Sequence, residues 1–442
     1  MYTKNKSKSL LFLLSQIIVV LVVCMEGLGV ISEFSSGVII IAVSFWNVLL
    51  LIQSKLLFTP LLFPYLYLFL FGLYELKLRK GMTVMQPLGK LVIVFCMMVW
   101  VVLCISSKSV FQRVDSFSRY RFNLKRLKKW ILLITAVSLS MMLYEWSKSG
   151  GVPALRPDAE TFRMSVSQSG ITHTLAIMIK IVAVLIEVYW ITGIHENQHK
   201  CKWFFPLYML VLLVMWGTAN RGELIFAPVL GLIILWTQYP PKKKTVLFFA
   251  ILGLLVLAVY PAVRGYSMYG NSYFVQYSAV STYPILGWFM PLYGTLAYNF
   301  EILNRLFETF HSSMPWGYGQ YTLLCHIPFL KIGEELWVVQ NRIWNNGFYG
   351  ALTSTYMGGW YADFGYAGCF IGTILICAMN LLLYSQMIKK KNMGSLVAYA
   401  YMFYVTLVGS YGDAFNFVFI CYEILIALVM NQCEQRMNQI ER

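Results

Sequence analysis

The sequence has few charged residues and no polar stretch long enough to fold as a separate soluble domain. Only 12% of its 442 residues are charged, whereas 59% are hydrophobic. Soluble globular domains carry charge on about a quarter of their residues. Apolar runs begin at Leu10 and recur almost to the end of the chain. This composition excludes an ordinary soluble enzyme and predicts one membrane domain over residues 1–442.

The motifs of several familiar chemistries are also absent. The chain has no P-loop, no dinucleotide fingerprint, no His-Glu-x-x-His and no serine nucleophile elbow. Its nine cysteines are single, and most lie within apolar runs, where a thiol behaves as a small hydrophobe. We therefore expect no disulfide framework, no metal site, no cofactor and no reaction driven by cytoplasmic nucleotide.

Acidic residues are scarce beside basic ones, 19 against 35, which gives a net charge of +16. The basic residues lie between apolar runs rather than in a module of their own, so we expect no nucleic-acid partner. The clusters around Lys4, 113–129, 242–244 and 389–391 fall on one side if every predicted span is real. The positive-inside rule makes that side the cytoplasm, and both termini lie there. Segment 75–90 breaks this pattern, because its basic residues then face outward. Either this loop is an exception to the rule, or one early apolar run does not span the membrane.

Apolar runs of spanning length are what the sequence has in abundance. A transmembrane helix needs about 20 apolar residues, and about twelve runs approach that length. We therefore predict an all-α polytopic membrane protein with about twelve transmembrane helices. Their expected positions are 10–28, 37–53, 56–74, 91–105, 130–146, 173–193, 203–219, 224–239, 245–262, 365–386, 394–411 and 414–430.

The same threading places two longer polar segments outside, 147–172 and 263–364. The second is a large external loop between predicted helices 9 and 10, and a loop this long is uncommon unless it is functional. Within it, 280–300 is apolar but broken by Pro284 and Pro291, which favours an interfacial or re-entrant segment. The loop is rich in aromatic residues, which either stack on sugar rings or form an interfacial belt.

Arginines on the external side are the candidate anion-binding residues, because a guanidinium can hold a phosphate bidentately. They are Arg156, Arg163, Arg221, Arg264, Arg305 and Arg342. Arg221 has a simpler alternative role in a tight turn, where its side chain extends to lipid head groups. The candidate proton acceptors on this side are Glu223, His311, His326 and Asp363.

Two ionisable residues lie inside one predicted span. Lys180 and Glu187 are seven residues apart and so share a helix face. They are about 10 Å apart along the axis, too far to pair directly. We expect each to meet a partner on another helix, with the alternative for Lys180 that its side chain only extends outward to the membrane surface.

The overall pattern resembles the Wzy-type oligosaccharide repeat-unit polymerases. The resemblance rests on the Asn220–Gly222 turn, Arg264 at the start of the long loop, and the closing segments Leu352–Tyr356 and Asp363–Gly368. It implies a GT-C-like, metal-independent glycosyltransferase of the bacterial inner membrane, active in O-antigen or capsule synthesis. Such an enzyme transfers the growing glycan from undecaprenyl diphosphate to the next lipid-linked unit on the outer face.

The resemblance also implies roles and partners. The external arginines would hold the diphosphate, and an external carboxylate or histidine would accept the proton of the acceptor hydroxyl. The expected partners are undecaprenyl-diphosphate-linked oligosaccharides, membrane lipids and a chain-length regulator protein.

Two other functions fit parts of the pattern. An O-antigen ligase shares the architecture and transfers finished glycan to an acceptor such as lipid A core. A lipid-linked oligosaccharide flippase has about twelve spans and internal charges such as Lys180, but short loops throughout. Segment 263–364 argues against the flippase.

Overall fold

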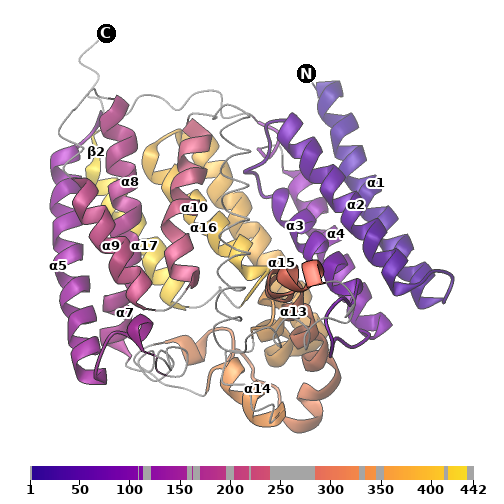
Figure 1. The fold of residues 1–442 in the computed structure, drawn as a ribbon. Helices are drawn as coiled ribbons and strands as arrows, with labels where there is room; N and C mark the ends of the chain where they lie inside the picture. Colours follow the sequence, from indigo (N-terminus) through magenta and orange to yellow (C-terminus); the bar gives the residue numbers. More distant parts are fainter. Residues whose placement is uncertain are drawn as a thin grey trace.

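The computed structural model describes residues 2–107, 109–112, 121–156, 162, 170–195, 204–218, 221–238, 284–327, 334–344, 353–412 and 417–435. This part of the chain is helical apart from turns and one pair of two-residue strands (Figure 1). The main helices are α1 (Tyr2–Gly27), α2 (Glu33–Gln53), α3 (Leu62–Glu75), α4 (Pro87–Ser106), α5 (Leu124–Ser149), α7 (Ile171–Ile177), α8 (Ile179–His195), α9 (Phe205–Gly217), α10 (Arg221–Gln238), α13 (Pro284–Ser313), α14 (Leu336–Trp344), α15 (Tyr356–Lys390), α16 (Met393–Gly409) and α17 (Phe417–Cys433). The short elements are η1 (Pro153–Leu155), η3 (Leu324–His326), β1 (Arg121–Phe122) and β2 (Glu434–Gln435).

The described helices are those of a multi-pass membrane protein, as the composition predicts. Six segments are long and apolar enough to cross a membrane: Lys8–Gly27, Glu33–Gln53, Pro87–Ser106, Leu124–Ser149, Ile171–Gly193 and Tyr356–Lys390. Five shorter apolar helices accompany them: Leu62–Glu75, Phe205–Gly217, Phe226–Thr237, Met393–Gly409 and Val418–Cys433. The predicted span at 245–262 lies outside the described residues. The count of twelve spans and the GT-C-like fold stay predictions.

Local sequence explains where several helices begin, end and pack. Ser32 caps α2 by accepting a hydrogen bond from the backbone N–H of Ser35, and α4 opens with Pro87. Helices α2 and α3 pack closely because both carry a glycine at the contact. A Cβ on Gly37 would lie 2.8 Å from the carbonyl oxygen of Gly72.

One end of the bundle carries the start of α1 and the end of α17 (Figure 1). There β1 pairs with β2, so the start of α5 joins the end of α17. Glu434 accepts hydrogen bonds from Asn392 Nδ2 (2.6 Å) and the backbone N–H of Gly394 (2.7 Å), at the turn between α15 and α16. The basic residues of 121–129 and 389–391 therefore gather at this end, as the threading expects. That this end faces the cytoplasm stays a prediction.

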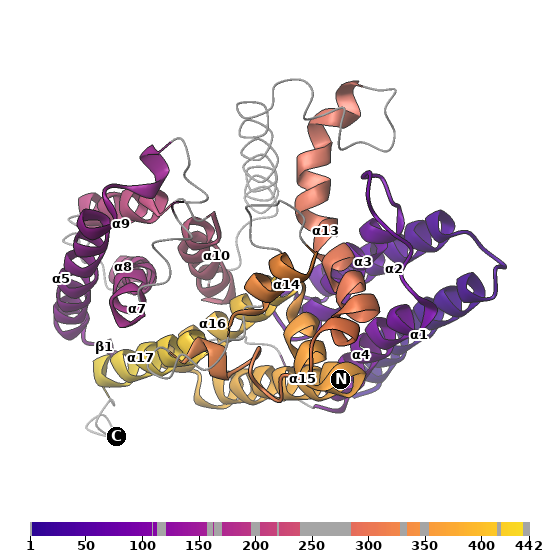
Figure 2. The ribbon, with the colours of Figure 1, turned by 90° about the horizontal axis from the view of Figure 1, so that it is seen from below.

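The opposite end, here named the loop end, holds segment 76–86, α13, α14 and residues 314–327 (Figure 1). The sequence predicts an interfacial or re-entrant segment at 280–300, and the structure has there the 30-residue helix α13, which continues to Ser313. Figure 2 shows α13 lying lengthwise across this end. Tyr293, Ala297, Phe300, Asn304 and Phe307 recur every three or four positions and form one buried face of α13, whereas Glu308 and Thr309 are exposed.

An aromatic core joins α13 to the membrane helices beneath it. The Phe300 ring lies 5.0 Å from that of Tyr67 and 5.6 Å from that of Phe71, both on α3. The Tyr67 hydroxyl lies 2.7 Å from Thr355 Oγ1, just before α15. The α13 helix is therefore a packed part of the bundle and can position side chains precisely enough for a site.

Candidate functional site

Two segments far apart in sequence bring cations together at the loop end. Segment 76–86 supplies Lys77, Arg79 and Lys80, and α13 supplies Arg305. These four residues are named here the basic cluster.

Segment 76–86 is held on α13 by hydrogen bonds to buried side chains. The Tyr293 hydroxyl donates to the carbonyl of Leu73 (2.8 Å) and accepts from the N–H of Leu78 (3.1 Å). Farther along, the N–H of Thr83 donates to Glu301 Oε2 (2.8 Å), and Asn304 Nδ2 donates to Thr83 Oγ1 (2.9 Å). The segment is thus fixed at both ends.

The two arginines of the cluster meet the same stretch of α13. Arg79 places its guanidinium carbon 4.0 Å from the ring centroid of Tyr298. Arg305 donates from Nε to Glu301 Oε1 at 3.0 Å. Tyr298 and Glu301 are three residues apart, so their side chains lie next to each other on the helix surface. Both guanidinium groups therefore lie along one face of α13, on neighbouring turns.

A glycine makes room for this arrangement. A Cβ on Gly294 would lie 3.1 Å from Arg79 Nη1, so a larger residue there would press on the guanidinium. Gly294 lies four residues before Tyr298 and on the same face of α13. The absence of a side chain at this position lets Arg79 rest against the helix.

The charge at this site is predominantly positive. Glu301 is completely buried, and it is the carboxylate that contacts Arg305. Lys80 is exposed. The Nζ atom of Lys77 donates to the Thr83 carbonyl (2.6 Å), and burial lowers the pKa of Lys77 to about 8, so it still carries charge at neutral pH. Such a cluster suits a ligand with more than one negative charge.

An exposed carboxylate lies beside the basic cluster. Glu308 is three residues after Arg305, on the same face of α13 as Tyr298 and Glu301. Its exposure leaves it accessible to a ligand held by the arginines. The arrangement can therefore bind phosphate groups and take up a proton nearby.

Two other predicted arginines lie elsewhere in the described chain. Arg342 forms an ion pair with Glu334, and both side chains are about half exposed. Arg156 follows η1 and places its guanidinium carbon 4.3 Å from the ring centroid of Phe162. The contacts described here, with Phe162 and Glu334, lie outside the basic cluster.

The remaining predicted residues are described only in part. Arg163 and Arg264 lie outside the described residues. Arg221 and Glu223 lie in the first turn of α10, and His326 ends η3, but only their backbones are described. Their predicted roles stay predictions.

Asp363 is a buried residue that organises the chain around it. It accepts hydrogen bonds from the N–H of Tyr321 (3.0 Å) and from the N–H and Oγ1 of Thr322 (2.9 and 2.7 Å). Both carboxylate oxygens are therefore engaged. This geometry favours a positioning role over proton transfer.

His311 lies near the end of α13 with its ring 3.7 Å from that of Trp316. Its Nε2 atom is 3.1 Å from the carbonyl of Tyr361, so Nε2 donates a hydrogen bond to this carbonyl. Nδ1 is buried and has no hydrogen-bond partner among the described residues. Glu308 is the more accessible proton acceptor in this arrangement.

The membrane-embedded Lys180 and Glu187 meet partners on other helices, which confirms that prediction. Lys180 Nζ lies 4.8 Å from the ring centroid of Phe419 and 5.0 Å from that of Tyr422, both on α17. Glu187 accepts a hydrogen bond from the hydroxyl of Tyr208 on α9 at 2.5 Å.

Sequence reasoning missed an acid–base pair at the loop end and several residues in and beside the basic cluster. Glu145 at the end of α5 is buried with its Oε2 3.1 Å from Nδ1 of His173 on α7. Arg79 and Lys80 were visible only as a violation of the positive-inside rule. Glu308 would be recognised as Arg305's neighbour once α13 is known to continue beyond residue 300.

Among the residues that the structure describes, no three His, Cys, Asp or Glu side chains are grouped to hold a metal ion. No family model matches the sequence, and neither the curated proteins nor the solved structures contain a match to it.

Proposed function

We propose that this chain is a membrane glycosyltransferase that joins lipid-linked oligosaccharide units. It acts on the outer face of the bacterial inner membrane and transfers the growing glycan from undecaprenyl diphosphate to the next lipid-linked unit. The observation that carries the proposal is the placement of Arg79 and Arg305 along one face of α13, on neighbouring turns. A multi-pass bundle suits substrates that are themselves lipids.

In the proposed reaction, a hydroxyl oxygen of the incoming unit attacks the anomeric carbon of the growing glycan. The new glycosidic bond forms as the bond from that carbon to the phosphate oxygen breaks, and the electron pair leaves with the lipid diphosphate. The hydroxyl proton passes to Glu308 and then to water.

The basic cluster stabilises the leaving group in this scheme. Negative charge grows on the diphosphate as the bond breaks, and fixed guanidinium groups lower the energy of that state. No energy source other than the lipid diphosphate is needed, in keeping with the absence of a P-loop.

The test is a set of variants expressed in cells that lack the wild-type protein. Arg79→Ala and Arg305→Ala should each reach the membrane at normal levels but lower chain extension about a hundredfold, the usual effect of removing one charge-stabilising donor. Gel analysis of the surface glycan should then show mainly single repeat units. We expect the same result for Arg221→Ala and Arg264→Ala.

Two further variants serve as controls. Lys148→Ala removes an exposed cation at the end of α5 and should leave chain length unchanged. Arg305→Lys keeps the charge but loses the planar fork, so it should fall between wild type and Arg305→Ala. Wild-type chain lengths in both Arg79→Ala and Arg305→Ala would contradict the diphosphate role of the cluster.

A further inference from the structure

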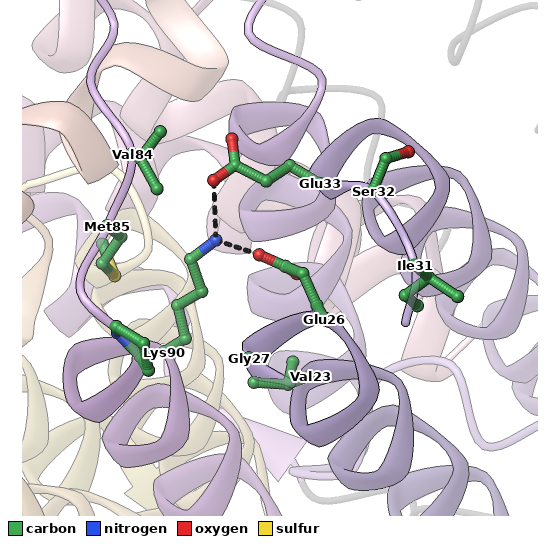
Figure 3. Close-up of a pocket in the computed structure, with 10 residues that line it drawn as sticks. Val23, Glu26, Gly27, Ile31, Ser32, Glu33, Val84, Met85 and Lys90 are labelled. Atoms are coloured by element: carbon green, nitrogen blue, oxygen red, sulfur yellow. Dashed lines mark hydrogen bonds and ion pairs between the residues drawn. The ribbon is translucent and has the colours of Figure 1, made fainter. Parts of the chain in front are cut away.

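A cavity of about 270 Å³ opens at the loop end between α1, α2 and α4 (Figure 3). It does not include the residues of the basic cluster. Its walls are apolar on several sides, with Val23, Ile31, Val84, Met85 and Pro87, and its polar groups are Glu26, Ser32, Glu33 and Lys90.

Three carboxylates surround the single ammonium group in this region. Lys90 Nζ forms ion pairs with Glu26, with Glu75 (2.6 Å) and, more loosely, with Glu33 (3.7 Å). Each carboxylate comes from a different helix, and Lys90 comes from a fourth. The charged residues that line the cavity itself are Glu26, Glu33 and Lys90, and their formal charges sum to one negative charge.

Part of this negative charge has no partner within the described residues. The side chain of Glu26 is only 7% exposed, and its carboxylate points toward Lys90 at the cavity (Figure 3). Its Oε2 atom is buried without a hydrogen-bond partner among the described residues, as is Oε1 of Glu75. A buried carboxylate oxygen that lacks a donor is unfavourable, so a ligand that supplies positive charge and N–H groups would stabilise the folded protein.

We propose that this cavity binds an organic ammonium ion of the ethanolamine kind. Its charged head would donate to Glu26 and Glu33, and its carbon atoms would lie against Val23, Ile31 and Met85. The volume exceeds what one bare metal ion fills, and the apolar walls would leave part of such an ion's coordination shell without ligands. The same chemistry occurs in free ethanolammonium and in the head group of phosphatidylethanolamine, and the position of the cavity at the end of the membrane helices suits either.

Binding here would also affect the basic cluster. Val84 and Met85 line the cavity, and their neighbour Thr83 is the residue that binds Glu301. A ligand in the cavity would therefore help to fix segment 76–86, which carries Arg79. This inference concerns binding and does not rest on the proposed glycosyltransferase activity.

The test measures thermal unfolding of the purified full chain in detergent during titration with ethanolammonium chloride. The melting temperature should rise and saturate, because a ligand that binds only the folded state stabilises it. Sodium chloride and magnesium chloride at matched ionic strength should give no such rise. Glu26→Gln should abolish the effect. The side chain of Glu33 is more exposed than that of Glu26. Glu33→Gln should raise the half-saturating concentration of ethanolammonium about tenfold. This variant also tests the proposal if Glu26→Gln does not fold.

A matched control and a lipid arm complete the design. Glu335→Gln replaces an exposed carboxylate outside the cavity and should respond as wild type. In lipid nanodiscs, the wild type should have a higher melting temperature with phosphatidylethanolamine than with phosphatidylglycerol if the lipid head group is the ligand. Glu33→Gln should then lose this difference. The proposal is overturned if no ammonium compound stabilises the wild type, if magnesium or sodium has the same effect, or if Glu33→Gln responds as wild type.

Discussion

Asp363 shows how one carboxylate can hold an irregular segment of chain in place. Its two oxygens accept from the backbone of Tyr321 and Thr322, and its own carbonyl accepts from the N–H of Tyr318 (3.3 Å). Residues 317–325 are thereby folded onto the start of α15. Since hydrogen bonds to a charged group contribute about 1.5–3 kcal/mol each, this one side chain has a large effect on local stability.

Asp363→Ala should therefore destabilise the protein by about 3 kcal/mol, because it leaves buried N–H groups without an acceptor. Asp363→Asn should cost less, since the amide keeps one oxygen. Thermal unfolding in detergent, measured together with chain extension, distinguishes a structural role of Asp363 from a role in proton transfer. A normal melting temperature with lost activity in Asp363→Asn would instead assign Asp363 to proton transfer.

At the level of elements, the apolar runs of the sequence predict the membrane helices well but not α13. A helix such as α4 is apolar all round, so counting hydrophobic residues finds it. In α13 the apolar residues alternate with Glu301, Arg305 and Glu308, and Pro291 interrupts the run. The helix is stable because one face packs on α3 and α15, and hydropathy does not measure that packing.

The candidate site was predictable only in part for a related reason. Arg305 could be singled out as an external cation, but its neighbourhood depends on segment 76–86. The hydrogen bond from Thr83 to Glu301 joins residues 218 positions apart. No local pattern encodes such a contact, so Arg79 could not be assigned to the same site.

Gly365 interrupts α15 with φ +63° and ψ −153°, a conformation that is nearly restricted to glycine. A Cβ there would also lie 2.6 Å from the ring of Trp316. We expect Gly365→Ala to lower the free energy of unfolding by about 3 kcal/mol or more, because it adds strain and overlap. Denaturant or thermal unfolding measures this.

Gly319→Ala is the matched comparison, since Gly319 has φ +95° but open space around its Cβ position. It should cost only the strain, about 1–2 kcal/mol. Equal losses in the two variants would show that the contact with Trp316 adds nothing.

At the scale of the whole molecule, the two ends of the bundle differ in what they carry. One end holds 121–129 and 389–391, and the other holds the basic cluster, α13 and the cavity between α1, α2 and α4. The positive charge of segment 76–86 runs against the positive-inside rule. The hydrogen bond from Thr83 to Glu301 holds this segment, and so its basic residues, against α13 at the loop end.

Single cysteines introduced at Lys80 and Tyr318 should react with a membrane-impermeant maleimide in intact spheroplasts, because both are exposed at the loop end. A cysteine at Lys390 should react only after the membrane is opened. The unmodified protein supplies the background from its own cysteines. Labelling of Lys390→Cys in intact spheroplasts would reverse the proposed orientation, and reporter fusions at Lys243 and Lys390 should agree by reporting cytoplasm.

The most direct test of the proposed function is reconstitution of the purified protein in vesicles with an undecaprenyl-diphosphate-linked repeat unit as the only substrate. We predict a ladder of joined units, with one undecaprenyl diphosphate released for each bond formed, and a rate about a hundredfold lower for Arg305→Ala. Movement of the lipid-linked unit across the bilayer without any joined product, or a glycan product formed only when a different acceptor is supplied, would contradict it.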